Sequence, residues 1–92
     1  MSSTEEKLSI ARQLLIEFGI SLEDVARHAK VRPDVADRAL QAQCMPSCPV
    51  VSLIRVQTAA EILLRQKGWQ GEAEILWREF YDMLATKADT TA

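Results

Sequence analysis

The stretch Ser21–Leu40, SLEDVARHAKVRPDVADRAL, decides how the rest of this chain is interpreted. Its apolar residues recur at helical spacing in two short segments, with a break after Ala29. Ser21 followed three residues later by Asp24 is typical of a helix start. Pro33 suits the first turn of the second segment, where its missing N–H costs nothing. The stretch therefore predicts two short helices joined by a tight turn.

A close crossing of two such helices has steric demands that the sequence meets. Ala26 is small where the helices would cross, and Val31 would insert an apolar side chain from the turn into the core. The second helix would bury Ala36, Ala39 and Leu40. Its outer side would then carry hydrogen-bonding residues, which are Arg32, Asp34, Asp37, Arg38 and Gln41.

Without gaps, this stretch resembles the helix-turn-helix opening of the lactose-repressor family. The matching positions are Leu22, Asp24, Val25, Ala26, Ala29, Val31, Arg38 and Leu40. Because a helix is expected before the motif and two after it, the whole chain is more similar to the small phage and plasmid repressors of the lambda-repressor-like group. The turn glycine of the lactose-repressor family is Lys30 here, which would need a left-handed backbone at a cost of about 1–2 kcal/mol. The resemblance implies a dimeric repressor that binds an inverted-repeat operator.

The motif implies two kinds of contact with duplex DNA. Base reading is expected from Arg32, Pro33, Asp34, Asp37, Arg38 and Gln41. Phosphate contacts are expected from Ser21, Arg27, His28 and Lys30. Arginine can bind guanine or phosphate, whereas aspartate can only accept a hydrogen bond, for instance from a cytosine amino group. Asp34 and Arg38 lie four residues apart and are expected to pair on the free helix.

The charge of the chain limits how such a protein would bind. Its formal net charge is -2, which argues against the strong non-specific binding of a basic protein. Positive charge is nevertheless concentrated in one short span, which contains Arg27, His28, Lys30, Arg32 and Arg38. The two aspartates of the second helix would repel phosphate, so we expect weak binding away from the operator and selective binding on it.

The remaining sequence predicts an all-α fold of about five helices in a single domain, residues 1–92. The first helix is expected to start at Ser3, with Glu6 completing a capping box. It would place Leu8, Ala11, Leu15 and Phe18 on one face, and Gly19 would end it. Further helices are expected at 50–66 and 72–85, followed by a flexible tail at 86–92. The helix-turn-helix itself spans 21–41.

The helical pair at 50–85 is expected to form the core and a homodimer interface. The apolar arc of helix 72–85 is wider than one core face needs. Its excess residues would meet a second copy of the chain, and the expected interface is Leu76, Trp77, Phe80, Tyr81 and Leu84. Val51 and Ile62 add an apolar patch on the flank of helix 50–66.

Other functions are less well supported by the sequence. No catalytic constellation, phosphate loop or metal-ligand set is recognised, so we expect no enzyme activity, no cofactor and no small-molecule ligand. Cys44 and Cys48 are interpreted as structural thiols, with a strained disulfide or a redox pair as alternatives. The N-terminal residues lack a signal-peptide pattern and no membrane span is expected, which favours the bacterial cytoplasm, at the nucleoid when DNA is bound.

The main rival interpretation is a helical adaptor or anti-activator that binds a protein partner without binding DNA. Trp69, Trp77, Phe80 and Tyr81 favour it, because aromatic residues are enriched in protein interfaces. The same residues could equally belong to the core.

Overall fold

The computed structural model describes residues 8–42 and 45–90, and the side chains of residues 8–42 and 46–85. Its elements are α1 (Ile10–Glu17), α2 (Leu22–Ala29), α3 (Pro33–Ala39), the short 3-10 helix η1 (Met45–Ser47), α4 (Val50–Gln66) and α5 (Ala73–Thr90). The described residues form no strand, so the all-α prediction is confirmed. An isolated antiparallel bridge joins Leu8 to Gln41.

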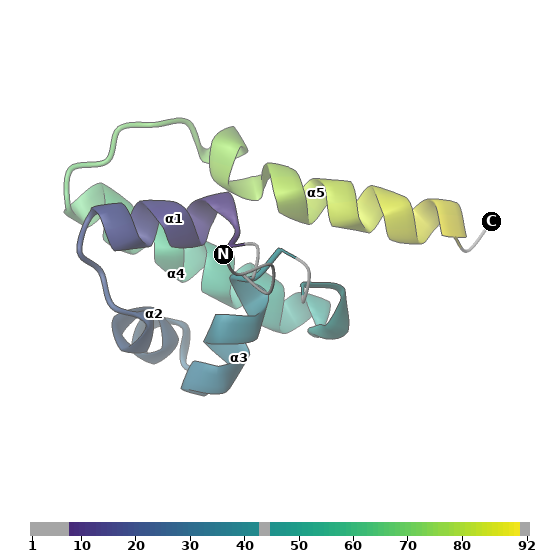
Figure 1. Cartoon of the computed structure of the whole chain (residues 1–92), viewed down its shortest axis with the longest axis horizontal. Coiled ribbons are helices and arrows are strands. Elements are labelled where there is room, and N and C mark those ends of the chain that lie inside the picture. Colours follow the sequence, from purple (N-terminus) through teal and green to yellow (C-terminus); the bar gives the residue numbers. More distant parts are fainter. Residues whose placement is uncertain (1–7, 43–44, 91–92) are drawn as a thin grey trace, which may run out of the picture.

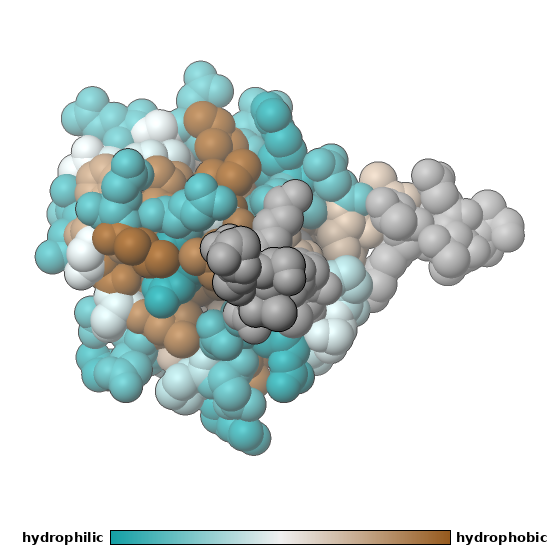
Figure 2. Space-filling view, viewed as in Figure 1, coloured by the Kyte–Doolittle hydropathy of each residue, from teal (hydrophilic) through white to brown (hydrophobic). Residues whose placement is uncertain are grey.

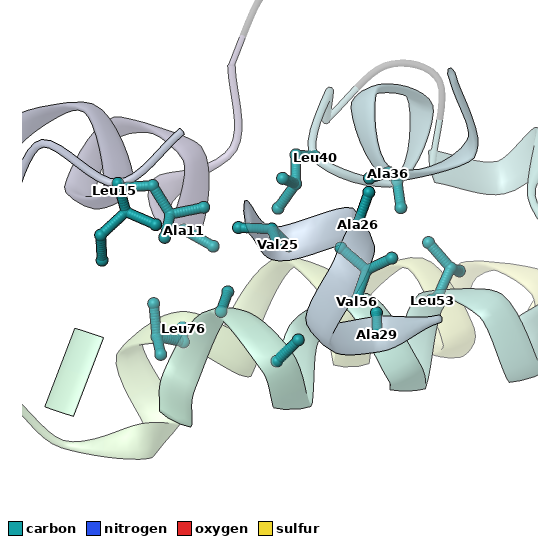
Figure 3. Packing of buried hydrophobic residues seen from close by; sticks show 14 of the residues in the cluster. Ala11, Leu15, Val25, Ala26, Ala29, Ala36, Leu40, Leu53, Val56 and Leu76 are labelled. Atoms are coloured by element: carbon teal, nitrogen blue, oxygen red, sulfur yellow. The ribbon is translucent and has the colours of Figure 1, made fainter. Parts of the chain in front are cut away.

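Helix α4 is the centre of the fold, since it packs against each of α1, α2, α3 and α5. Its apolar positions explain why: one wide side of the helix is buried, comprising Leu53, Val56, Ala59, Ala60 and Leu64. The other helices contribute to the same buried cluster from around it (Figure 3). Helices α2 and α3 lie together at one edge of the molecule, away from α5, and the C-terminal part of α5 extends past the other helices (Figure 1).

The start of α1 differs from the sequence-based expectation. Ser3 and Glu6 lie outside the described residues, and the helix begins only at Ile10 with Ser9 as its N-cap. The Ser9 hydroxyl accepts from the N–H of Arg12 at 3.2 Å. The expectation that Leu8 is helical is therefore wrong, because its backbone pairs with Gln41 instead.

A carboxylate on α5 also helps to cap the start of α1. Oε1 of Glu79, on α5, accepts from the backbone N–H of Ile10 at 3.0 Å. The first N–H groups of a helix have no partner within it, so this bond satisfies a donor that Ser9 leaves open. Ser9 is itself fully buried, and its N–H donates to the carbonyl of Leu40 at 3.0 Å.

Three helices end in the same left-handed hydrogen-bond pattern. At Gly19 after α1, Lys30 after α2 and Gly68 after α4, φ is positive, at 72°, 61° and 105°. In each case the next residue's N–H donates to the carbonyl five residues back, at 2.8, 3.0 and 2.9 Å. This is the Schellman motif, whose left-handed residue is usually glycine. The expected helix stop at Gly19 and the left-handed Lys30 are both confirmed.

The predicted boundaries are correct for α4 but not for the end of α5. Helix α4 has the predicted bounds, whereas α5 continues to Thr90. The prediction that α5 ends at residue 85 is therefore wrong, because residues 86–90 continue the helix. The polar residues after 85 predict a helix end, but neither Gly nor Pro follows Ala73 to interrupt the helix. Cys48 is buried, and Cys44 lies outside the described residues.

Candidate nucleic-acid interface

Helices α2 and α3 pack against each other, and the turn between them holds Lys30, Val31 and Arg32. Ala26 is buried on α2, and Val31 packs against the core from the turn. Ala36 is fully buried on α3, as are Ala39 and the adjoining Leu40. The inner sides expected for the two helices are thus confirmed. Their tight contact requires small residues, and Ala26 and Ala36 both belong to the buried cluster in Figure 3.

The outer side of α3 begins with an ion pair. The backbone of Arg32 is extended, at φ -73° and ψ 150°, as the residue that precedes a helix. Its guanidinium thereby reaches Asp34, with Nε–Oδ1 and Nη2–Oδ2 distances of 3.1 Å each. The expectation that Asp34 pairs with Arg38 is wrong, because both carboxylate oxygens are turned to Arg32. Arg38 is exposed and forms no ion pair with any described residue.

Gln41 does not take part in this outer side. The residue is only 8% exposed, and its Nε2 donates to Oδ2 of Asp37 at 3.1 Å. The prediction that Gln41 reads bases is therefore wrong. Helix α3 ends at Ala39, so Gln41 leaves the helical register and its backbone bridges to Leu8. Asp37 is half-buried and holds this amide, which leaves Arg32, Pro33, Asp34 and Arg38 as the exposed part of the predicted base-reading set.

Of the predicted phosphate contacts, Ser21 caps the start of α2 and Arg27 lies in its last turn. The Ser21 hydroxyl accepts from the N–H of Asp24 at 3.1 Å, which confirms it as the helix cap. The Asp24 carboxylate binds Arg27 at 3.2 Å. This pair is exposed to solvent, so it contributes little to stability and leaves the Arg27 guanidinium accessible to another anion. The charge of Arg27 is thus balanced by the carboxylate of Asp24, one turn earlier on the helix.

The other two predicted phosphate contacts border a groove that the sequence did not reveal. His28 and Lys30 line a hollow of about 380 Å³ between the end of α2 and the outer side of α4. We call this hollow the α2–α4 groove, and its lining is His28, Ala29, Lys30, Ile54, Arg55, Thr58, Ala59 and Ile62. A separate hollow beside α2 is bordered by Glu23, Arg27 and Pro33. His28 consequently lies on the α4 side of α2, away from the start of α3.

The spacing of residues in the sequence indicates part of the groove lining on α4. Ile54, Thr58 and Ile62 recur every four residues, which places them on one face of a helix. The sequence marked Ile62 as part of an apolar flank, but which helix would border that flank depends on tertiary packing. Arg55 gave no local signal of a function.

The predicted dimer interface is mostly occupied within the protomer. Leu76 is fully buried and Phe80 is 3% exposed, so the prediction that they contact a second copy is wrong. Both pack into the core, which accounts for most of the wide apolar arc of α5. Trp77 is half-buried, and its indole N–H donates to Glu61 at 3.1 Å. Leu84 is also half-buried, and Tyr81 is exposed.

Apolar surface is present elsewhere, but it is divided among separate elements. Ile16 on α1 and Ile75 at the start of α5 are exposed. Figure 2 shows hydrophobic surface over these two elements, interrupted by hydrophilic side chains. A second exposed set on α4 comprises Val50, Val51, Ile54 and Ile62. Two members of the α4 set, Ile54 and Ile62, line the α2–α4 groove.

Comparison of the chain with protein-family models, curated proteins and solved structures found no match. Within residues 8–42 and 45–90, no helix has both the length and the hydropathy needed to cross a membrane. In the same ranges, His, Cys, Asp and Glu nowhere form a group of three or more that could hold a metal ion.

Proposed function

We propose that this protein is a transcriptional regulator that binds duplex DNA by placing α3 in the major groove. The observation that carries the proposal is the arrangement of α2 and α3. Their inner sides are tightly packed on small residues, and α3 presents from its outer side Arg38, which is exposed and forms no ion pair within the described part of the chain. A short helix packed across another in this way is the arrangement by which helix-turn-helix proteins read bases.

The charges on α3 support selective rather than strong binding. Arg32 and Asp34 neutralise each other on the free protein, and Asp37 is held by Gln41. Arg38 is therefore the side chain best placed to bind guanine, which arginine contacts through two acceptors. Opening the Arg32–Asp34 pair costs little because it is exposed, with side chains 80% and 51% accessible. A phosphate or base could then replace either partner.

We propose that the protein binds an inverted-repeat operator as a homodimer. On α5 the exposed candidates for the contact between copies are now Tyr81 and Ile75, since Leu76 and Phe80 are buried. Two copies related by a two-fold axis would contact half-sites about 10 bp apart. Sedimentation of the wild type and of Tyr81→Glu tests this part, and a wild-type monomer at tens of micromolar would contradict it. Such a regulator would act in the bacterial cytoplasm, at the nucleoid.

The decisive experiment selects duplexes from a random pool with the full chain and then measures binding of variants to the selected site. Arg38→Ala should cost about 1–3 kcal/mol and relax the preference at one base pair of each half-site. Lys30→Ala should weaken binding to all duplexes alike and reduce the salt dependence. Arg78→Ala, an exposed arginine on α5, is the matched control and should change neither.

Two results would defeat the proposal. One is a selection that enriches no sequence. The other is wild-type affinity for every duplex in both Arg38→Ala and Lys30→Ala. Either would favour the adaptor or anti-activator interpretation, in which the surface binds protein alone.

A further inference from the structure

The α2–α4 groove has an apolar floor and a cationic rim. Ala29 and Ala59 form its narrow base, where two helices approach closely. Ile54 and Ile62 stand along one wall and remain 43% and 39% exposed. Large exposed aliphatic side chains beside a hollow are an unfavourable arrangement in water, and they often mark a binding site.

The two isoleucines have the spacing of a helix-binding site. They lie eight residues apart on α4, which corresponds to about 12 Å along the helix axis. An amphipathic helix bound in a groove uses apolar residues at i, i+3, i+4 and i+7, and the outermost of these span about 10 Å. Thr58 lies between the isoleucines and is small enough to let a bound side chain approach α4.

The charge around the groove specifies its partner. Lys30 and Arg55 stand on opposite walls, one at the end of α2 and the other on α4, and His28 lies beside them. None of the three forms an ion pair with a described residue. The adjoining hollow contains one carboxylate, Asp24, and it is already bound to Arg27. A ligand with carboxylates on both flanks of an apolar stripe would complement this rim.

We infer that the α2–α4 groove binds an acidic amphipathic helix of a partner protein. Apolar side chains of that helix would contact Ile54 and Ile62, and its flanking glutamates or aspartates would pair with Lys30 and Arg55. This function goes beyond DNA binding, because the groove shares no lining residue with the hollow that Pro33 of α3 borders, and no residue of α3 lines it. Because Lys30 is also an expected phosphate contact, DNA and the partner helix would compete for that side chain.

The inference is tested by titrating the full chain with a synthetic helical peptide that has leucine at helical spacing and glutamate at the remaining positions. We expect saturable shifts in the amide NMR signals of the groove residues. Raising the salt concentration should weaken binding, because the rim contacts are charged. The same peptide with lysine in place of glutamate should bind at least about tenfold more weakly, which corresponds to about 1.4 kcal/mol.

Variants separate the groove from the rest of the surface. Arg55→Glu and Ile62→Asp should each weaken binding of the acidic peptide at least about tenfold. Arg78→Glu, a matched charge reversal on α5, should leave it unchanged. All three residues are exposed, so circular dichroism should confirm that the variants remain folded.

Three outcomes would overturn the inference. Equal binding of the glutamate and lysine peptides would show that the rim does not select charge. Shifts confined to α5 or to the outer side of α3 would place the site elsewhere. A homodimer that Ile62→Asp dissociates would show that a second copy covers the groove. Loss of DNA binding in Arg38→Ala bears on the proposed function alone, since Arg38 does not line the groove.

Discussion

The left-handed residue that ends α2 allows a quantitative test of the turn. Lys30 has φ 61° and ψ 43°, a conformation that costs a residue with a Cβ about 1–2 kcal/mol. Gly19 and Gly68 occupy the corresponding position after α1 and α4. Lys30→Gly should remove the strain, but glycine loses roughly 0.5–1 kcal/mol more conformational entropy on folding. From the backbone alone, these two effects give an expected net gain of about 0.5–1 kcal/mol in the free energy of unfolding.

The loss of the lysine charge needs its own control. A cation near a helix C-terminus contributes typically 0.3–1 kcal/mol through the helix dipole. Lys30→Ala loses that contribution and keeps the left-handed strain, so it should be no more stable than the wild type. Because both variants lose the charge, the difference between them isolates the backbone, and we expect it to be about 0.5–1 kcal/mol.

Urea denaturation followed by circular dichroism measures this difference, and thermal unfolding provides a second reading. A gain of 1 kcal/mol raises Tm by about 4–8 °C in a domain of this size. The matched reverse changes are Gly19→Ala and Gly68→Ala, which should each destabilise, although nothing lies within 4 Å of either added Cβ. If Lys30→Gly proved no more stable than Lys30→Ala, Lys30 would not be left-handed in solution and the tight turn would be incorrect.

Three further substitutions test the packing around α4 and α5. Glu79→Ala should lower the free energy of unfolding by about 0.5–2 kcal/mol, because it removes the carboxylate that caps α1. Glu79→Gln should lose much less, because its amide oxygen can still accept from the N–H of Ile10. Equal losses in the two variants would argue against this bond. Gln57 is 1% exposed, and its side-chain amide has no hydrogen-bond partner among the described residues. Gln57→Leu should therefore raise the free energy of unfolding, measured by urea denaturation, by about 1–3 kcal/mol. A lower free energy of unfolding would show that the amide has a partner in solution. The Trp69 ring occupies the place that a Cβ on Gly71 would take. Gly71→Ala should therefore lower the free energy of unfolding by about 1–3 kcal/mol and alter the tryptophan fluorescence spectrum. An unchanged spectrum would contradict that contact.

Local signals in the sequence were enough to predict α2, the start of α3 and the whole of α4. Ser21 and Pro33 mark helix starts through their own chemistry, and the apolar period of residues 50–66 is that of a buried helix. The start of α1 was missed because Ser9 lacks the acidic residue three positions later that completes a capping box. The acidic residue that helps cap this helix is Glu79, 69 positions from Ile10 along the chain. No local pattern could have indicated it.

The candidate site was predicted less completely than the fold. Helical periodicity placed Arg38 correctly on the outer side of α3, but it also extended the helix through Gln41, which is buried. On α5 the apolar period could not distinguish a core face from a dimer face, and Phe80 belongs to the core. The α2–α4 groove depends on which two helices meet, and that information lies in the packing of Ala29 against α4 rather than in either segment alone.

The bond between Glu79 and the N–H of Ile10 also has a consequence for synthesis of the protein. On the ribosome, Ile10 emerges long before Glu79, so during most of translation the first turn of α1 has no carboxylate acceptor at that N–H. Isolated helices as short as α1 are marginal in water, which leaves this segment dependent on later contacts. A nascent chain stalled before residue 79 should therefore lack a stable α1, which should form only after Glu79 has been synthesised. Chains truncated before Glu79 should be open to proteases at their first helix as well as in their incomplete α5.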